Sequence, residues 1–136
     1  MRHEGATAFS MIEKELPNGF HDGELHSFTI SRERREMSLE MSADMSDSEV
    51  TRRIVHRRCR VSLTGLIFVQ VEAPCVPADS NERDTLIDDG DLNGDRLARV
   101  WPDPLPRDSF ARWIFLNATN GFIYFAATGA ELEWLS

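Results

Sequence analysis

Apolar and polar residues alternate most regularly in the segment spanning residues 36–43. Met37, Leu39, Met41 and Ala43 occupy one parity, and the positions between them are glutamates and serines. Successive side chains of a strand point to opposite faces, so this period of two predicts a strand with one buried face and one wet face. Such a pattern is typical of an antiparallel sheet that is covered on one side.

Similar segments lie on either side of this strand. Residues 24–31 alternate so that His26, Phe28 and Ile30 are expected to share one face. Residues 55–64 alternate between polar positions and an apolar parity made of Val55, Cys59, Val61 and Leu63. A charged turn at residues 32–35 separates the first two strands, and the polar residues 44–51 separate the second from the third.

Three further segments complete the predicted elements at the N-terminus and in the middle of the chain. Residues 6–16 carry Phe9, Ile12 and Leu16 at helical spacing, which predicts a short helix ended by the Pro-Asn-Gly turn at 17–19. Gly65 stands where a strand would bend or bulge. The segment of residues 66–73 is apolar on both parities until Gln70, so we expect both of its faces to be covered.

The C-terminal part predicts a hairpin. Two apolar segments flank Asn120 and Gly121, and Asn-Gly is a strong signal for a two-residue hairpin turn. The pairs expected from that turn are Leu116 with Phe125 and Ile114 with Ala127. A last short strand is expected in residues 131–135. The side chains predicted to be buried are Met37, Leu39, Met41, Val61, Leu63, Ile114 and Phe125.

Residues 74–109 interrupt the pattern. They hold five of the six prolines and the acidic cluster of residues 79–95, with a helical turn expected near residues 96–100. With 136 residues, the chain has the length of a single domain, 1–136. We therefore predict one mainly β domain, with α+β open. It would be an antiparallel sandwich or curled sheet of six to seven strands, with a short N-terminal helix and one long acidic loop.

Charge excludes some partners. The net charge is −8, which argues against a nucleic-acid-binding protein, because such proteins present a basic face. No apolar run reaches the length of a membrane span, and residues 1–16 lack the apolar core of a secretion signal, so we expect a cytoplasmic protein. Residues 79–95 hold seven acids and one arginine, whereas residues 32–60 hold eight arginines and six acids. The sequence predicts no cofactor and does not determine the oligomeric state.

The sequence DGDLNG at residues 89–94 resembles part of a calcium-binding loop. Asp89, Asp91, Asn93 and Gly94 match the first ligand positions and the glycine of such a loop. The twelfth position, which should be a bidentate glutamate, is Val100. We therefore predict an acidic surface loop and no metal, and we take the acidic side chains Asp88, Asp89 and Asp91 as candidate binding residues for a partner.

A second group of polar residues lies near the first strand. His21, Asp22, Glu24 and His26 could bind a metal or exchange protons, but His21 and His26 differ in strand parity. A short acceptor side chain after a turn can instead bond free backbone N–H groups. We predict that His21 and Asp22 stabilise the turn, and we keep them as candidate binding residues.

Cysteine and aromatic residues complete the candidates. Cys59 shares the apolar parity of its strand and is expected in the core, and nothing in the sequence indicates whether it ever pairs with Cys75. The aromatic residues of the C-terminal hairpin are expected to be mostly core. Trp101, next to a proline in the long loop, is expected to contact a partner, because an exposed tryptophan often marks a binding surface.

The N-terminal pattern resembles a family of small bacterial proteins of unknown function. Its members read G-F-H-D-x-x-(I/L), which corresponds here to Gly19 through Leu25, and the match extends over residues 17–70. Ser31 stands where this family commonly has Asp. The layout is more loosely similar to β-rich immunity proteins of bacterial toxin systems. The resemblance implies no activity and no catalytic residues.

These observations favour a protein-binding module of immunity type without catalytic activity, whose partner is a basic protein attracted by the acidic residues 79–95. The alternative is a small-molecule-binding or metal-binding β domain that uses His21 and Asp22. An enzyme ranks third, because no known catalytic motif is present.

Overall fold

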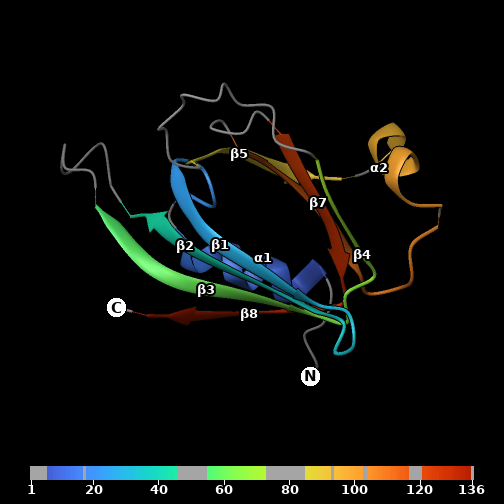
Figure 1. Cartoon of the computed structure of the whole chain (residues 1–136), viewed down its shortest axis with the longest axis horizontal. Helices are drawn as coiled ribbons and strands as arrows, with labels where there is room; N and C mark the ends of the chain where they lie inside the picture. Colours follow the sequence, from blue (N-terminus) through green and yellow to red (C-terminus); the bar gives the residue numbers. More distant parts are fainter. Residues whose placement is uncertain are drawn as a thin grey trace.

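The computed structural model describes residues 6–16, 18–45, 55–72, 85–92, 94–102, 104–116 and 121–135. Its helices are α1 (Ala6–Glu15) and α2 (Gly94–Val100). Its strands are β1 (Gly23–Ser31), β2 (Glu36–Asp44), β3 (His56–Thr64), β4 (Phe68–Val71), β5 (Thr85–Asp91), β6 (Phe110–Leu116), β7 (Gly121–Ala127) and β8 (Gly129–Trp134). The prediction of a mainly β protein with a short N-terminal helix is confirmed (Figure 1). Within the described residues, no helix is both long and apolar enough to cross a membrane.

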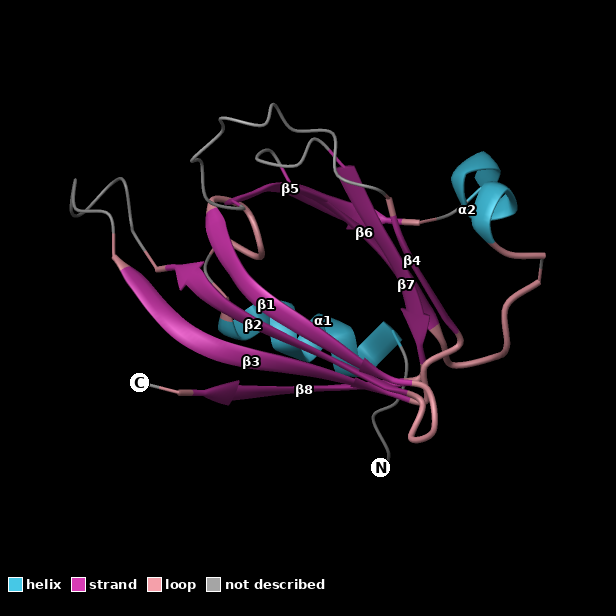
Figure 2. Cartoon of the chain, viewed as in Figure 1, coloured by secondary structure: helices cyan, strands magenta, loops and turns pink. Residues whose placement is uncertain are grey.

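All strand pairs are antiparallel, in the order β4-β7-β6-β5-β1-β2-β3-β8. The sheet divides into a β2 half, made of β1, β2, β3 and β8, and a β7 half, made of β4, β5, β6 and β7. Among the described residues, two pairs join the halves between β1 and β5, Gly23 with Leu86 and Glu24 with Thr85. The sheet therefore curls strongly, as Figure 2 shows.

The opposite corner is formed by strands that continue from one half into the other. Residues 65–67, beginning with Gly65, separate β3 from β4, and Thr128 separates β7 from β8. The Thr128 N–H lies 3.2 Å from the carbonyl oxygens of both Thr64 and Gly65. Gly65 has a φ of +59°, and a Cβ atom there would collide with the Thr128 hydroxyl group. The predicted bend at Gly65 is confirmed, because only glycine fits this corner without strain.

The core lies between the two halves. The seven side chains predicted to be buried are all buried, and Cys59 is buried as expected. α1 contributes Phe9, whose ring centroid lies 4.8 Å from that of Phe110 and 6.2 Å from that of Phe125. Because Ile12 and Leu16 are also buried, the predicted helical spacing places one apolar face of α1 against the sheet.

Strand count and loop content differ from the prediction. Among the described residues eight strands form instead of six to seven, because β5 lies within the expected loop. β5 and α2 together replace much of that loop, and α2 confirms the helical turn expected near residues 96–100. Residues 73–84, 93 and 103 lie outside the described residues.

The predicted register of the C-terminal hairpin is wrong. Leu116 pairs with Gly121 and Ile114 with Ile123, so the connection comprises residues 117–120 rather than Asn120 and Gly121 alone. The even shift preserves side-chain parity, which is why Ile114 and Phe125 are still buried.

Exposure at three apolar positions also differs from the pattern. Val71 is 44% exposed, because β4 is an edge strand, so the expectation that residues 66–73 are covered on both faces is wrong at this position. Val55 precedes β3 and is exposed. In β1 a bulge between Leu25 and Ser27 separates His26 from the face of Phe28 and Ile30, and Ile30 is 39% exposed.

Candidate functional site

His21 and Asp22 lie in the turn that leads into β1. The His21 Nε2 and Asp22 Oδ2 atoms are 3.5 Å apart, and both side chains are more than half exposed. The backbone closes the turn, since the His21 N–H donates to the Asn18 carbonyl and the Gly23 N–H donates to the Phe20 carbonyl. Asp22 has a φ of +59°, a conformation that aspartate tolerates better than most residues. This geometry supports the idea that His21 and Asp22 stabilise the turn before β1, which stays a prediction. In the described part of the chain, no three potential ligands cluster as a metal site would require.

Asp89 and Asp91 do not belong to a loop. They lie on β5 and bind Arg112 of β6, whose Nη2 atom donates to Asp89 Oδ2 at 2.7 Å and whose Nη1 atom donates to Asp91 Oδ1 at 2.6 Å. The two aspartates share one face because they are separated by a single residue, Gly90. Asp88 is on the same strand opposite Phe115, and its side chain lies outside the described atoms. The expectation of an acidic surface loop is therefore wrong for residues 85–91.

Arg112, whose guanidinium is largely buried, forms a charge cluster with these two aspartates and Glu13 of α1. The Arg112 side chain is 11% exposed, its Nη2 atom lies 3.3 Å from Glu13 Oε2, and its guanidinium lies 4.9 Å from the centre of the Phe9 ring. Burial raises the pKa of Glu13, and Asp89 and Asp91 add to this effect although Arg112 opposes it. Burial lowers the pKa of Arg112, but the hydrogen bonds to Asp89 and Asp91 and the charge of Glu13 outweigh it, so that pKa is raised. The cluster joins α1, β5 and β6 and leaves little free capacity to bind another cation.

Within the arginine-rich surface predicted from residues 32–60, Arg58 and Arg60 are paired with carboxylates. On the outer face of the β2 half, Arg60 binds Glu40 at 2.7 Å and Glu133 at 3.3 Å, and Arg58 lies 3.6 Å from Glu40. The hydrogen bond from Arg60 lowers the pKa of Glu40. Cation and carboxylate alternate across the strands, so this face is balanced in charge.

Trp101 follows α2 and is half-buried rather than free. Its ring stacks on that of Phe68 in β4, with centroids 5.4 Å apart and an interplanar angle of 14°. Both residues lie near a small apolar cluster on the outer face of the β7 half. Its buried members are Leu92, Ala111 and Ala126, and its partly buried members are Ile67, Phe68, Leu97, Val100, Leu105, Trp113 and Tyr124. Trp101 therefore helps to hold α2 against the sheet.

Four aromatic residues form a row on the same outer face: Trp113, Phe115, Phe122 and Tyr124. All four are partly exposed, on the parity opposite to Ile114 and Phe125. Phe122 lies at the centre of this aromatic row, with its centroid 5.7 Å from Trp113, 4.9 Å from Phe115 and 5.5 Å from Tyr124. The expectation that the hairpin aromatics are mostly core is wrong, since only Phe125 among them is fully buried.

Gly90 leaves room for the Trp113 ring of this row against β5. Gly90 pairs with Trp113, and a Cβ atom at position 90 would lie 2.8 to 2.9 Å from atoms of the indole ring. The Asp-Gly-Asp sequence therefore has two consequences. Its aspartates bind the buried Arg112, and its glycine leaves room for Trp113 on the other face.

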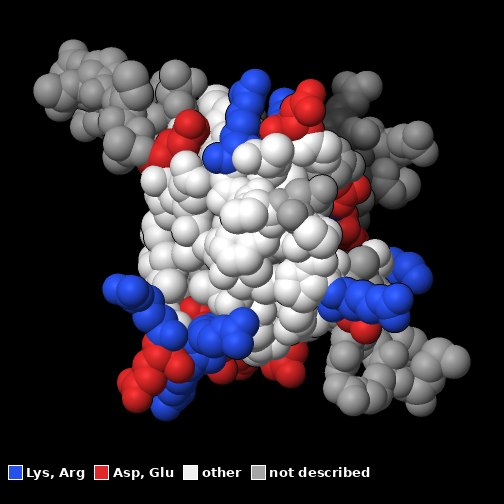
Figure 3. Space-filling view, turned by 90° about the vertical axis from the view of Figure 1, so that its right-hand side faces the viewer, with Lys and Arg blue, Asp and Glu red and all other residues white. Residues whose placement is uncertain are grey.

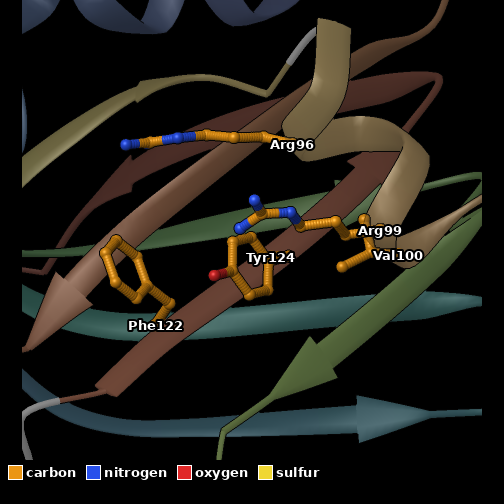
Figure 4. Close-up of a pocket in the computed structure, with 5 residues that line it drawn as sticks. All are labelled: Arg96, Arg99, Val100, Phe122 and Tyr124. Carbon is orange, nitrogen blue, oxygen red and sulfur yellow. The ribbon is translucent and has the colours of Figure 1, made fainter.

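α2 places two arginines beside the aromatic row. Arg96, Arg99 and Val100 line a hollow of about 140 Å³ together with Phe122 and Tyr124, and we call it the arginine hollow (Figure 4). The Arg96 guanidinium lies 5.1 Å from the centre of the Trp113 ring. Burial raises the pKa of Tyr124, Glu72 adds to this effect, and Arg96 and Arg99 partly oppose it. Figure 3 shows a broad area without charged side chains on the side of the molecule where α2 and β4 lie, bordered by charges of both signs.

Sequence reasoning did not identify the aromatic row or the arginine hollow. The alternation of Trp113, Phe115, Phe122 and Tyr124 with core residues was a usable signal, because it shows two apolar faces on one hairpin. No such signal connects α2 to β7. Searches with family models, against curated proteins and against solved structures found no significant match to the chain.

Proposed function

We propose that this protein is a non-catalytic protein-binding module of immunity type, which neutralises its partner by covering a surface of it. The observation that carries the proposal is the aromatic row, four adjoining and partly exposed rings beside two arginines. Tryptophan, tyrosine and arginine supply most of the binding energy in protein interfaces, and phenylalanine is also enriched there. The binding surface therefore moves from the acidic residues 79–95 to the outer face of the β7 half.

The state of the chemically reactive residues supports a binding role. Asp89 and Asp91 are hydrogen-bonded to Arg112. Burial raises the pKa of Cys59 to about 11, so its thiol stays protonated and unreactive at neutral pH.

We infer a basic partner from the charge of the whole chain. At a net charge of −8, the protein attracts cationic proteins over long distances and speeds their association. Such steering suits an immunity protein that must capture a basic toxin in the bacterial cytoplasm. The attraction brings the partner near, whereas the aromatic row provides the contact.

The size of the arginine hollow favours a protein partner over a small molecule. Ligand sites commonly enclose roughly 300–1,000 Å³. The hollow measures about 140 Å³, which suits one side chain rather than a whole ligand.

Affinity capture from the native host tests the proposal. The wild-type chain should retain a basic protein, and Phe122→Ala should lose most of it, because this substitution removes the central ring of the row. Ile30→Ala is the matched control, since Ile30 is also an exposed apolar strand residue but lies in the β2 half. Equal capture by all three proteins, or capture of no basic protein by any of them, would contradict the proposal.

A further inference from the structure

We propose that the arginine hollow receives one acidic side chain, Asp or Glu, from the partner protein. This inference rests on the proposed function, because it names what the partner presents to the surface described above. In this proposal, Arg96 and Arg99 bind the carboxylate of that side chain, and the rings of Phe122 and Tyr124 contact its apolar stem.

The first argument is charge. Arg96 and Arg99 are exposed, and neither forms an ion pair with any carboxylate that the structure describes. Arg58, Arg60 and Arg112 all have such partners. The two arginines are three residues apart on α2, and both line the hollow. They concentrate positive charge on an acidic molecule. Glu72 is the described carboxylate near Phe122 and Tyr124, where it accepts from the Phe122 N–H, and a carboxylate of the partner would be complementary to the two arginines.

The second argument is shape. The two arginines reach from α2 in the direction of Phe122 and Tyr124, as Figure 4 shows. The rings of Phe122 and Tyr124 are stacked, with an interplanar angle of 10°, so they offer a flat apolar wall. An acidic side chain has a short apolar stem and a charged end, which matches an aromatic wall next to guanidinium groups.

The third argument is the hydroxyl group of Tyr124. Like an ordinary tyrosine, it is protonated at neutral pH and can donate a hydrogen bond. A carboxylate in the hollow could thus accept from the phenol as well as from the arginines. Glutamine has nearly the same shape but no charge, so it would lose the charge-assisted part of these hydrogen bonds.

NMR titration of the full-length chain tests this inference with N-acetyl-glutamate N-methylamide as the probe. The neutral isostere, N-acetyl-glutamine N-methylamide, is the matched control. We expect the glutamate probe to shift the Arg96 and Arg99 Nε–Hε signals saturably and to bind at least about ten times more tightly than the glutamine probe. Equal responses to the two probes, or no saturable shift at these arginines, would overturn the inference. Inorganic phosphate is a third probe, and tighter binding of phosphate than of the glutamate probe would also overturn it.

Variants connect the response to the hollow. Arg96→Gln and Arg99→Gln should each weaken the glutamate probe at least about fivefold. Arg107→Gln, which removes the same charge from an exposed turn, should leave it unchanged. If all three variants weakened binding of the glutamate probe equally, the effect would come from the net charge of the protein rather than from the hollow, and the inference would be contradicted.

The same variants separate this inference from the proposed function. Suppose that Phe122→Ala abolishes capture of the partner while Arg96→Gln and Arg99→Gln capture it normally. The aromatic row is then supported as the binding surface, and the proposal that the arginine hollow receives an acidic side chain is refuted. If Phe122→Ala captures the partner normally, the proposed function fails.

Discussion

Replacing Arg112 by methionine should destabilise the protein more than any other single charge removal among the described residues. Asp89 is the main reason, because its side chain is 15% exposed and would lose its bond to the guanidinium. Removing one partner of a buried ion pair typically costs about 3–5 kcal/mol. Asp91 adds little because it is 72% exposed, and methionine retains much of the apolar packing of the arginine stem. We therefore expect a loss of about 3–5 kcal/mol in the free energy of unfolding at pH 7.

The dependence on pH provides a second test of the same substitution. Without Arg112, the pKa of Glu13 should rise further, because burial and the charges of Asp89 and Asp91 raise it and the arginine that opposes them is gone. A carboxyl group with a raised folded-state pKa contributes stability below its unfolded value, near 4.5 for Glu13, and loses it as the pH rises through the folded-state pKa. The difference between variant and wild type should therefore shrink from pH 7 toward pH 4.

Urea unfolding across that pH range measures both effects. Arg60→Met is the control, since Arg60 also contacts two carboxylates but lies on the outer face of the sheet. It should cost far less than Arg112→Met. A loss below about 1 kcal/mol for Arg112→Met at pH 7, or a difference that grows on acidification, would refute the reasoning.

Four further predictions concern other sites. Leu39→Ala should cost about 2–5 kcal/mol in denaturant unfolding, because Leu39 is 1% exposed, and a loss under about 0.5 kcal/mol would contradict its burial in the core. Asp22→Asn should leave the thermal midpoint nearly unchanged, whereas Asp22→Ala should cost about 1 kcal/mol, because its φ is +59°. Equal thermal midpoints for Asp22→Asn and Asp22→Ala would refute this expectation. Cys59 should react with a thiol reagent at pH 8 only as fast as the protein unfolds, because burial raises its pKa to about 11. Calorimetry at low micromolar calcium should show no binding at Asp89 and Asp91, and saturable heat would contradict their engagement by Arg112.

Strand parity predicted the core well because it depends only on local alternation. Met37, Leu39 and Met41 are each 1% exposed, and Val61 and Leu63 are fully buried. Register depends on the length of the connection between strands, which the Asn-Gly signal suggested incorrectly. The hairpin nevertheless kept its buried residues, because the true register differs by an even number of residues.

The acidic segment was harder to predict because its meaning depends on a distant residue. Asp89 and Asp91 resemble part of a calcium loop when the sequence is considered alone. Their partner Arg112 is 21 residues beyond Asp91, and Glu13 comes from the first helix. Only the pairing of β5 with β6 brings these charges together, so local patterns could not distinguish a metal site from a buried ion cluster.

The binding surface was missed for a related reason. A hairpin whose two faces are both apolar can be buried on both sides or can present one face to a partner. The choice depends on what covers the second face, and here α2 covers only part of it, through Leu97 and Val100. The remaining rings and the arginines of α2 form the proposed site, which required knowledge of the tertiary structure.

Side-chain footprinting of the captured complex tests the central claim most directly. Hydroxyl-radical labelling of the free and bound protein reports the solvent exposure of each aromatic side chain. We predict strong protection of Phe122, Tyr124 and Trp113 on binding and little change at Phe28 or Trp134 in the β2 half. Protection confined to the β2 half, with the aromatic row labelled equally in both states, would contradict the account.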